Sequence, residues 1–387
     1  MTGEPQLRLG DHGPSVRAVC ERLAATGDLP ASCAGEQLFD SGVERAVRAF
    51  QQRRGLLVDG VVGTQTYRAL DGARWLLGDR ILLHRAGHLL TGDDVAMLQQ
   101  RLLNLGFSCG RVDGVFGPRT DRALRELQVG VGLRPDGLAG PKTLRALAQL
   151  ARSVAGGAPQ ALREADRVRT SGPSLRGRLI VLDPGHSVAE PGAAVHGLVE
   201  ADLTLDLARR IEGRLAVAGV QVVLTRGLTG NPTELERAEL ANALNADLLL
   251  SLHCESLVAT PQAQGVASFF YGHSDHGGAW SVTGERLATL VQREITARTD
   301  LLDCYSHARA WELLQRTQMP AVRTDVGHLS NAADARRLGD PAFRDTLAEA
   351  IVVAIQRVYL VGEADATTGT LRVADVLAQS RSAGPPR

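Results

Sequence analysis

The sequence predicts a C-terminal α/β domain, with a mostly parallel sheet and helices on both faces, preceded by two small all-α domains of three helices each. Two patterns predict this fold. In the first half, a block of sequence recurs at a shift of 77 positions, and its apolar residues follow helical spacing. In the second half, short apolar runs alternate with amphipathic segments. The length of 387 residues agrees with two or three domains of roughly 100–200 residues each.

Composition excludes several classes of function. Forty-three basic residues balance forty-three acidic ones, so we expect no broad electrostatic capture of nucleic acid or of an anionic membrane. No apolar run approaches the ~18 residues of a membrane span. The N-terminus lacks a basic segment followed by an apolar one, so we expect no signal peptide and a cytoplasmic location, with extracellular action only by a non-classical route. The five cysteines cannot all pair and are expected to be reduced thiols.

Residues 1–75 and 80–152 are predicted to form the two helical domains. In the second repeat, Val95, Leu98 and Leu102 recur at helical spacing. Each repeat has an Asp-Gly pair before its last helix, at Asp59-Gly60 and Asp136-Gly137. Glycine there supplies the positive φ that such turns require.

The second repeat carries Leu102-x-x-Leu105-Gly106, then Asp113-Gly114-Val115-Phe116-Gly117 and Thr120. These motifs resemble the peptidoglycan-binding domain family, which implies binding of cell-wall glycan-peptide. The first repeat matches less well, since Phe39-Asp40-Ser41-Gly42 stands where the second has Asp113 to Gly117. The alternative is a pair of helical spacers that no longer bind the wall.

Residues 153–176 are predicted to be a linker, because breaker clusters lie at 156–159 and 171–174. Residues 177–362 form the predicted α/β domain. In parallel sheets of this kind, ligands gather at the carboxyl ends of the strands. Strands are expected at 179–182, 221–224, 247–252, 266–271 and 321–326, and helices at 200–215, 232–245, 284–297 and 341–358.

Three residues of this domain form a pattern typical of a metal site. His186 and His253 follow two of the predicted strands, and Glu200 opens a helix. Two imidazoles and one carboxylate, with an open fourth position, are typical of catalytic zinc. The charge of the metal would acidify a bound water and polarise an amide carbonyl. Spacing alone leaves open the alternative that these are ordinary histidines at strand ends.

The surrounding motifs favour the metal site. These motifs are Asp183-Pro184-Gly185-His186, Pro191-Gly192-Ala193, Gly197 to Asp202, Leu224-Thr225-Arg226, Arg237 to Asn242, Ser251-Leu252-His253 and Val326 to Asn331. With them, the chain from Leu179 to Val358 resembles the zinc-dependent N-acetylmuramoyl-L-alanine amidase family. The resemblance implies Zn²⁺ held by His186, Glu200 and His253, and cleavage of the amide between N-acetylmuramic acid and L-alanine. The candidate substrate-binding residues are Arg226, Ser330 and Asn331.

The candidate catalytic residue departs from the family pattern. The family places a catalytic Glu two residues before the late glycine, and here that residue is Asp325. A general base must come within about 2.6–3.2 Å of its proton, and a displacement near 1 Å costs on the order of 10²-fold in rate. We therefore predict weak or lost catalysis, as in a pseudoenzyme. The alternative is that Asp325 works through a bridging water.

Residues 363–387 are predicted to be a flexible tail that contains Thr367, Thr368 and Thr370. These are candidates for phosphorylation, which adds about −1.5 to −2 charge that an Arg-lined reader can bind. The alternative is an ordinary disordered tail.

The whole arrangement resembles the actinobacterial CwlM-type proteins. It implies a cytoplasmic regulator that binds MurA, the enzyme of the first committed step of peptidoglycan-precursor synthesis, and a phosphothreonine-binding protein. The competing hypothesis is an active amidase whose partners are peptidoglycan or its muropeptide precursors. A phage endolysin is a third hypothesis, but it should keep the catalytic Glu.

Overall fold

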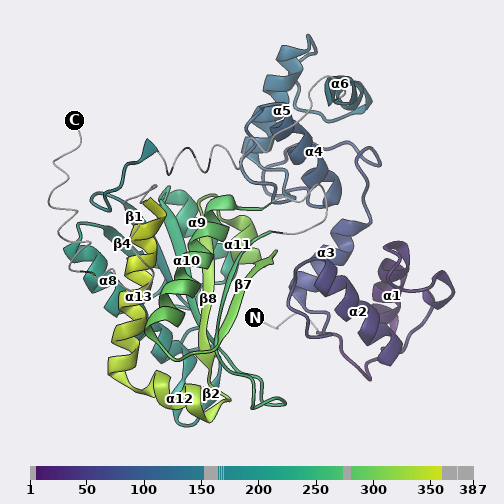
Figure 1. The fold of residues 1–387 in the computed structure, drawn as a ribbon. Helices are drawn as coiled ribbons and strands as arrows, with labels where there is room; N and C mark the ends of the chain where they lie inside the picture. Colours follow the sequence, from purple (N-terminus) through teal and green to yellow (C-terminus); the bar gives the residue numbers. More distant parts are fainter. Residues whose placement is uncertain are drawn as a thin grey trace. The chain divides into compact units, whose positions relative to one another are not determined.

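The computed structural model describes residues 6–151, 164, 166, 168, 170–272, 280–359 and 373. They divide into a helical unit that contains the two N-terminal repeats and an α/β unit formed by most of the chain after residue 160 (Figure 1). The phosphorylation candidates Thr367, Thr368 and Thr370 lie outside the described residues. Within the described ranges, no helix is long and apolar enough to cross a bilayer.

The helical unit contains the two predicted three-helix repeats. The first consists of α1 (Pro14–Ala25), α2 (Ser41–Arg53) and α3 (Thr64–Ala73), with a short 3₁₀ turn at Ala31–Cys33. The second consists of α4 (Asp93–Asn104), α5 (Pro118–Gly130) and α6 (Pro141–Ala151). Each repeat has an apolar core of its own, which confirms the helical organisation predicted for this half.

A buried glutamine explains why the repeats share their motifs. The Gln128 amide donates to Asp136 Oδ1 at 2.8 Å and to Thr143 Oγ1 at 3.2 Å, and its Oε1 accepts from Gly137 N at 2.9 Å. Gln51 and Gln99 make the same set of bonds in their own turns. One side chain thus ties a helix to the turn that starts the next helix, and the motif residues serve the fold of each repeat.

The α/β unit is built on a six-stranded sheet of order β4-β1-β5-β8-β6-β7. Four neighbouring strands are parallel: β4 (Gln221–Leu224), β1 (Leu179–Pro184), β5 (Leu248–Glu255) and β8 (Ala321–His328). Strand β6 (Val266–Tyr271) runs antiparallel to β8, and β7 (Asp303–Arg309) forms the edge. A hairpin of β2 (Ala194–Val195) and β3 (Leu198–Val199) precedes the first helix of this unit.

Helices cover both faces of the sheet. On one face, α8 (Glu200–Val217), α10 (Val282–Arg298) and α13 (Pro341–Tyr359) enclose the main apolar core. On the other face, α9 (Glu234–Ala243) brings Arg237 onto Asp183 of β1. The shorter helices α11 (Glu312–Arg316) and α12 (Ala332–Gly339) flank β8 in sequence. The predicted α/β class with a mostly parallel sheet is confirmed.

Strand alternation separates the core from the polar face. On β5, the even-numbered Leu248, Leu250, Leu252 and Cys254 pack into the main core, so His253 and Ser251 face the other side. The sequence predicted this strand to end at residue 252, but β5 continues to Glu255 because β8 pairs with it beyond His253. His253 therefore lies inside a strand, and its pairing with Asp325 of β8 fixes its backbone.

Candidate metal centre

His186, Glu200 and His253 come together at the carboxyl ends of β1 and β5. Their ligand atoms all lie within 4.8 Å of one another. Glu200 Oε1 lies 3.0 Å from His253 Nδ1, and Glu200 Oε2 lies 3.3 Å from His186 Nε2. The two imidazole rings meet edge to face, with centroids 5.1 Å apart. Tetrahedral zinc with bonds of about 2.0–2.1 Å separates its ligand atoms by roughly 3.3 Å, so the observed donor set fits that ion.

The backbone holds Glu200 in place. Its side chain is only 3% exposed, and its oxygens accept from Ala193 N at 3.0 Å and from Cys254 N at 2.9 Å. Glu200 is also the first residue of α8, where the helix dipole favours a carboxylate. The charge is therefore fixed between the two imidazoles.

Two glycines make room for the ligands. A Cβ on Gly185 would lie 2.4 Å from the His253 ring, and a Cβ on Gly192 would lie 2.5 Å from Glu200 Oε2. Real Cβ atoms essentially never approach heavy atoms so closely. The glycines of the Pro-Gly-His and Pro-Gly-Ala motifs are thus required because the ligand side chains occupy the space where a Cβ would lie.

The protonation states of His253 and Cys254 are also compatible with metal binding. Burial, and then the nearby charge of Arg323, lower the pKa of His253 well below its usual value, so the ring is neutral and can act as a ligand. Burial, and then Glu200, raise the pKa of Cys254 well above its usual value. The Cys254 thiol is protonated and packs into the apolar core.

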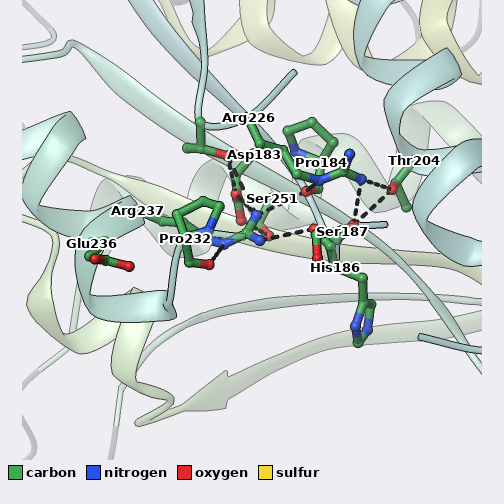
Figure 2. Close-up of polar contacts among 12 residues, drawn as sticks. Asp183, Pro184, His186, Ser187, Thr204, Arg226, Pro232, Glu236, Arg237 and Ser251 are labelled. Carbon is green, nitrogen blue, oxygen red and sulfur yellow. Dashed lines mark hydrogen bonds and ion pairs between the residues drawn. The ribbon is translucent and has the colours of Figure 1, made fainter. Parts of the chain in front are cut away.

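A network of buried polar groups supports the loop that carries His186 (Figure 2). Arg237 donates to Asp183 Oδ1 at 2.6 Å, to Pro184 O at 2.9 Å and to His186 O at 3.0 Å. Ser251 donates to Asp183 Oδ2 at 2.6 Å. Burial by itself would raise the pKa of Asp183, but Arg237 and the hydrogen bonds hold this pKa below its usual value. These bonds fix a backbone in which His186 has a φ of 59°, a strained left-handed conformation for a non-glycine residue.

Arg226, a predicted substrate contact, lies beneath the same loop (Figure 2). Its guanidinium donates to Pro184 O at 2.9 Å, and to Gly185 O and Ala201 O, both at 2.8 Å. The residue is 5% exposed. These bonds hold the backbone on either side of the metal ligands, and a contact between Arg226 and substrate stays a prediction.

The other two predicted substrate residues also bond to the backbone. Ser330 Oγ accepts from Leu257 N at 2.9 Å. Asn331 caps α12 by accepting from Ala333 N at 2.9 Å, and it donates to Pro261 O at 3.1 Å. Both residues hold the loop that follows β5, and direct contact with substrate stays a prediction for them as well.

Asp325 lies opposite His253 in the register of β5 and β8. Its Oδ1 accepts a hydrogen bond from Arg323 Nε at 2.8 Å, and the residue is 4% exposed. The candidate catalytic carboxylate thus lies next to the candidate metal ligand His253, and its catalytic role stays a prediction. It is also bound by a guanidinium, which the sequence analysis did not anticipate. The available signal was the spacing of Arg323 and Asp325, since residues two apart on a strand face the same side.

Comparison with known proteins agrees with this geometry. Residues 180–357 match the family described as N-acetylmuramoyl-L-alanine amidase, and residues 12–70 and 91–147 match the putative peptidoglycan binding domain. The chain is 46% identical to the N-acetylmuramoyl-L-alanine amidase CwlM of Mycobacterium tuberculosis, across 97% of this chain and 95% of that protein. The chain belongs to the CwlM-type N-acetylmuramoyl-L-alanine amidase family.

Other amidases match about half of this chain. The germination-specific N-acetylmuramoyl-L-alanine amidase of Bacillus subtilis is 30% identical over 48% of this chain and 81% of its own length. Among solved structures, the amidase AmiC2 of Nostoc punctiforme is 28% identical, with a TM-score of 0.43, over 46% of this chain and 96% of that chain. The match to CwlM covers 97% of this chain and thus includes both repeats.

Proposed function

We propose that this amidase-family protein binds Zn²⁺ at His186, Glu200 and His253, binds peptidoglycan, and hydrolyses the muramyl–L-alanine amide weakly or not at all. One observation carries the proposal: a complete set of metal ligands lies beside a catalytic carboxylate that is short and paired with Arg323. The first part of the observation supports metal binding, and the second supports slow chemistry.

The residues have separate tasks in this proposal. A bound zinc supplies a Lewis acid that activates water and polarises the amide carbonyl. His186, Glu200 and His253 would hold it, and substrate could reach the site from solvent because the His186 side chain is 35% exposed. Asp325 is the carboxylate that would accept the proton. Its hydrogen bond to Arg323 and its short side chain both oppose that task.

The test compares zinc-loaded wild type with the His186→Ala/His253→Ala double variant. Each protein is incubated with purified peptidoglycan and with a soluble muramyl peptide, and free peptide is measured by mass spectrometry. We expect zinc in the wild type alone, sedimentation with peptidoglycan for both proteins, and little or no peptide release. Equal zinc content in the two proteins would refute the proposed metal site. Rapid release of peptide by the wild type would refute the claim of weak catalysis.

A second candidate function is a non-catalytic cytoplasmic regulator of peptidoglycan-precursor synthesis that acts on MurA and is controlled by threonine phosphorylation in the tail. The Arg323–Asp325 pair favours it, because a family site that keeps its metal ligands but binds its own base suits recognition better than turnover. The test is the rate of purified MurA with and without this protein, before and after treatment with a Ser/Thr kinase. An unchanged rate in both states rejects this candidate.

A further inference from the structure

We propose that Arg323 is a positioning residue that holds Asp325 back from the metal centre, so that the replacement of Glu by Asp is only half of the reason for slow chemistry. This inference rests on the proposed function of the same site. It assigns a role to a residue that belongs to neither the metal ligands nor the catalytic position.

Arg323 and Asp325 project from the same face of the sheet as His253. Val322 and Val326 pack into the main core, so the alternating Arg323 and Asp325 project from the opposite face, which is the face of His253. In the register of the two strands, Arg323 lies opposite Ser251 and Asp325 lies opposite His253. Arginine, aspartate and metal ligand therefore share one corner of the sheet.

The hydrogen bond from Arg323 draws the Asp325 carboxylate away from the carboxyl end of β8. Arg323 precedes Asp325, so it lies farther from the carboxyl end of β8, where ligands gather in sheets of this type. The bond from Arg323 Nε to Asp325 Oδ1, at 2.8 Å, holds the carboxylate toward the middle of the strand. Aspartate is already one methylene shorter than glutamate. Both effects move the carboxylate away from the substrate side, and about 1 Å of misplacement costs on the order of 10²-fold.

Burial makes the bond persistent. The side chains of Arg323 and Asp325 are 20% and 6% exposed, so little water competes for either partner. Burial alone would lower the pKa of Arg323, but Asp325, and then Glu234 and Glu200, keep it above its usual value. The guanidinium stays charged beside the metal ligands, and its positive charge also opposes the binding of a cation at His253.

The experiment uses six forms of the full-length protein. Four of them are wild type, Arg323→Leu, Asp325→Glu and the double variant Arg323→Leu/Asp325→Glu. Arg323→Lys/Asp325→Glu tests whether a restored positive charge restores the restraint. Arg210→Leu is the matched control, because Arg210 pairs with Asp206 and Asp345 on the outer side of α8. Each form is assayed for kcat and KM on a soluble muramyl peptide, for zinc affinity by chelator competition, and for the temperature of unfolding.

We expect Asp325→Glu alone to raise kcat less than tenfold, and the Arg323→Leu/Asp325→Glu double variant to raise it about 100-fold with KM unchanged. The Arg323→Lys/Asp325→Glu form should return toward the value of Asp325→Glu alone. Arg323→Leu should bind zinc several-fold more tightly than wild type, whereas Arg210→Leu should bind it equally well.

Two results would overturn the inference. One is a kcat for Asp325→Glu alone that equals that of the double variant. The other is a double variant that is folded and zinc-loaded but no faster than wild type. If Arg323→Leu does not fold, Arg323→Met replaces it, because methionine is a long, flexible side chain that fills space without offering Asp325 a strong donor. Failure of the proposed function looks different, since no form would then bind zinc.

Discussion

Gly185→Ala is expected to remove most of the zinc affinity while leaving the fold intact. The added Cβ would lie 2.4 Å from His253 Cε1 and 2.6 Å from both ring nitrogens. Ordinary van der Waals contact begins at 3.4 Å, so the imidazole must retreat by about 1 Å. It cannot retreat without cost, because Glu200 Oε1 holds its Nδ1 at 3.0 Å.

The expected loss of zinc affinity follows from the narrow range of distances at which a side chain can coordinate a metal ion. Ligand distances in metal sites hold to within about ±0.2 Å, so a ring displaced by about 1 Å is no longer a ligand. Loss of an orienting contact around a ligand costs about 10- to 100-fold in metal affinity. Displacement of the ligand itself should cost at least ~100-fold, which corresponds to about 2.7 kcal/mol.

The assay is zinc affinity by competition with a chelator, beside thermal unfolding of the metal-free protein. Gly213→Ala is the matched control. Gly213 lies inside α8 with nothing within 4 Å of its added Cβ. That substitution should stabilise the helix by roughly 0.5–1 kcal/mol and leave zinc affinity unchanged. Wild-type zinc affinity in Gly185→Ala would refute the claim that this glycine makes room for His253.

Three other substitutions test the rest of the structure. Arg226→Lys replaces a fork of donors by one ammonium, and should weaken zinc binding about tenfold in the chelator assay. Gln128→Leu should cost about 2–3 kcal/mol of unfolding free energy in denaturant, because its buried partners lose their hydrogen bonds. Asp183→Asn should lower stability at neutral pH. Since the folded pKa of Asp183 is below its unfolded value, its contribution is present above about pH 4 and is lost as pH falls through the folded pKa. Stability measured from pH 7 downward should therefore fall less in Asp183→Asn than in wild type.

Exposed residues of the same types supply the controls. Arg209→Lys, Gln52→Leu and Asp202→Asn change exposed positions, and each should shift stability by no more than about 0.5 kcal/mol. If Arg226→Lys weakened zinc binding no more than Arg209→Lys, the role given to the buried arginine would be contradicted. Equal losses of unfolding free energy in Gln128→Leu and Gln52→Leu would contradict the role given to the buried hydrogen bonds of Gln128. If stability fell with pH in the same way in Asp183→Asn and in wild type, the lowered pKa of Asp183 would be contradicted.

Local patterns made much of this protein predictable. The repeat motifs recur because the same bonds form within each short segment, as with Gln128 and Gly137. Strands β4 and β6 have their predicted bounds, since both are apolar runs. Strand β7 was missed because its sequence, Asp303 to Arg309, has no apolar run and lies at an exposed edge. Helix α12 was missed for a similar reason, because it is short and rich in charge.

Residue types in a fixed order were enough to predict the fold class and the family, and they also predict His186, Glu200 and His253 as candidate metal ligands. The surroundings of these three residues appear only in the three-dimensional structure. It showed that Gly185 leaves room for the ring of His253, which is distant in sequence, and that Arg226 holds the loop of His186. It also paired Arg323 with Asp325. Such contacts depend on which strands become neighbours and on which face each side chain takes, and residue order alone does not specify either.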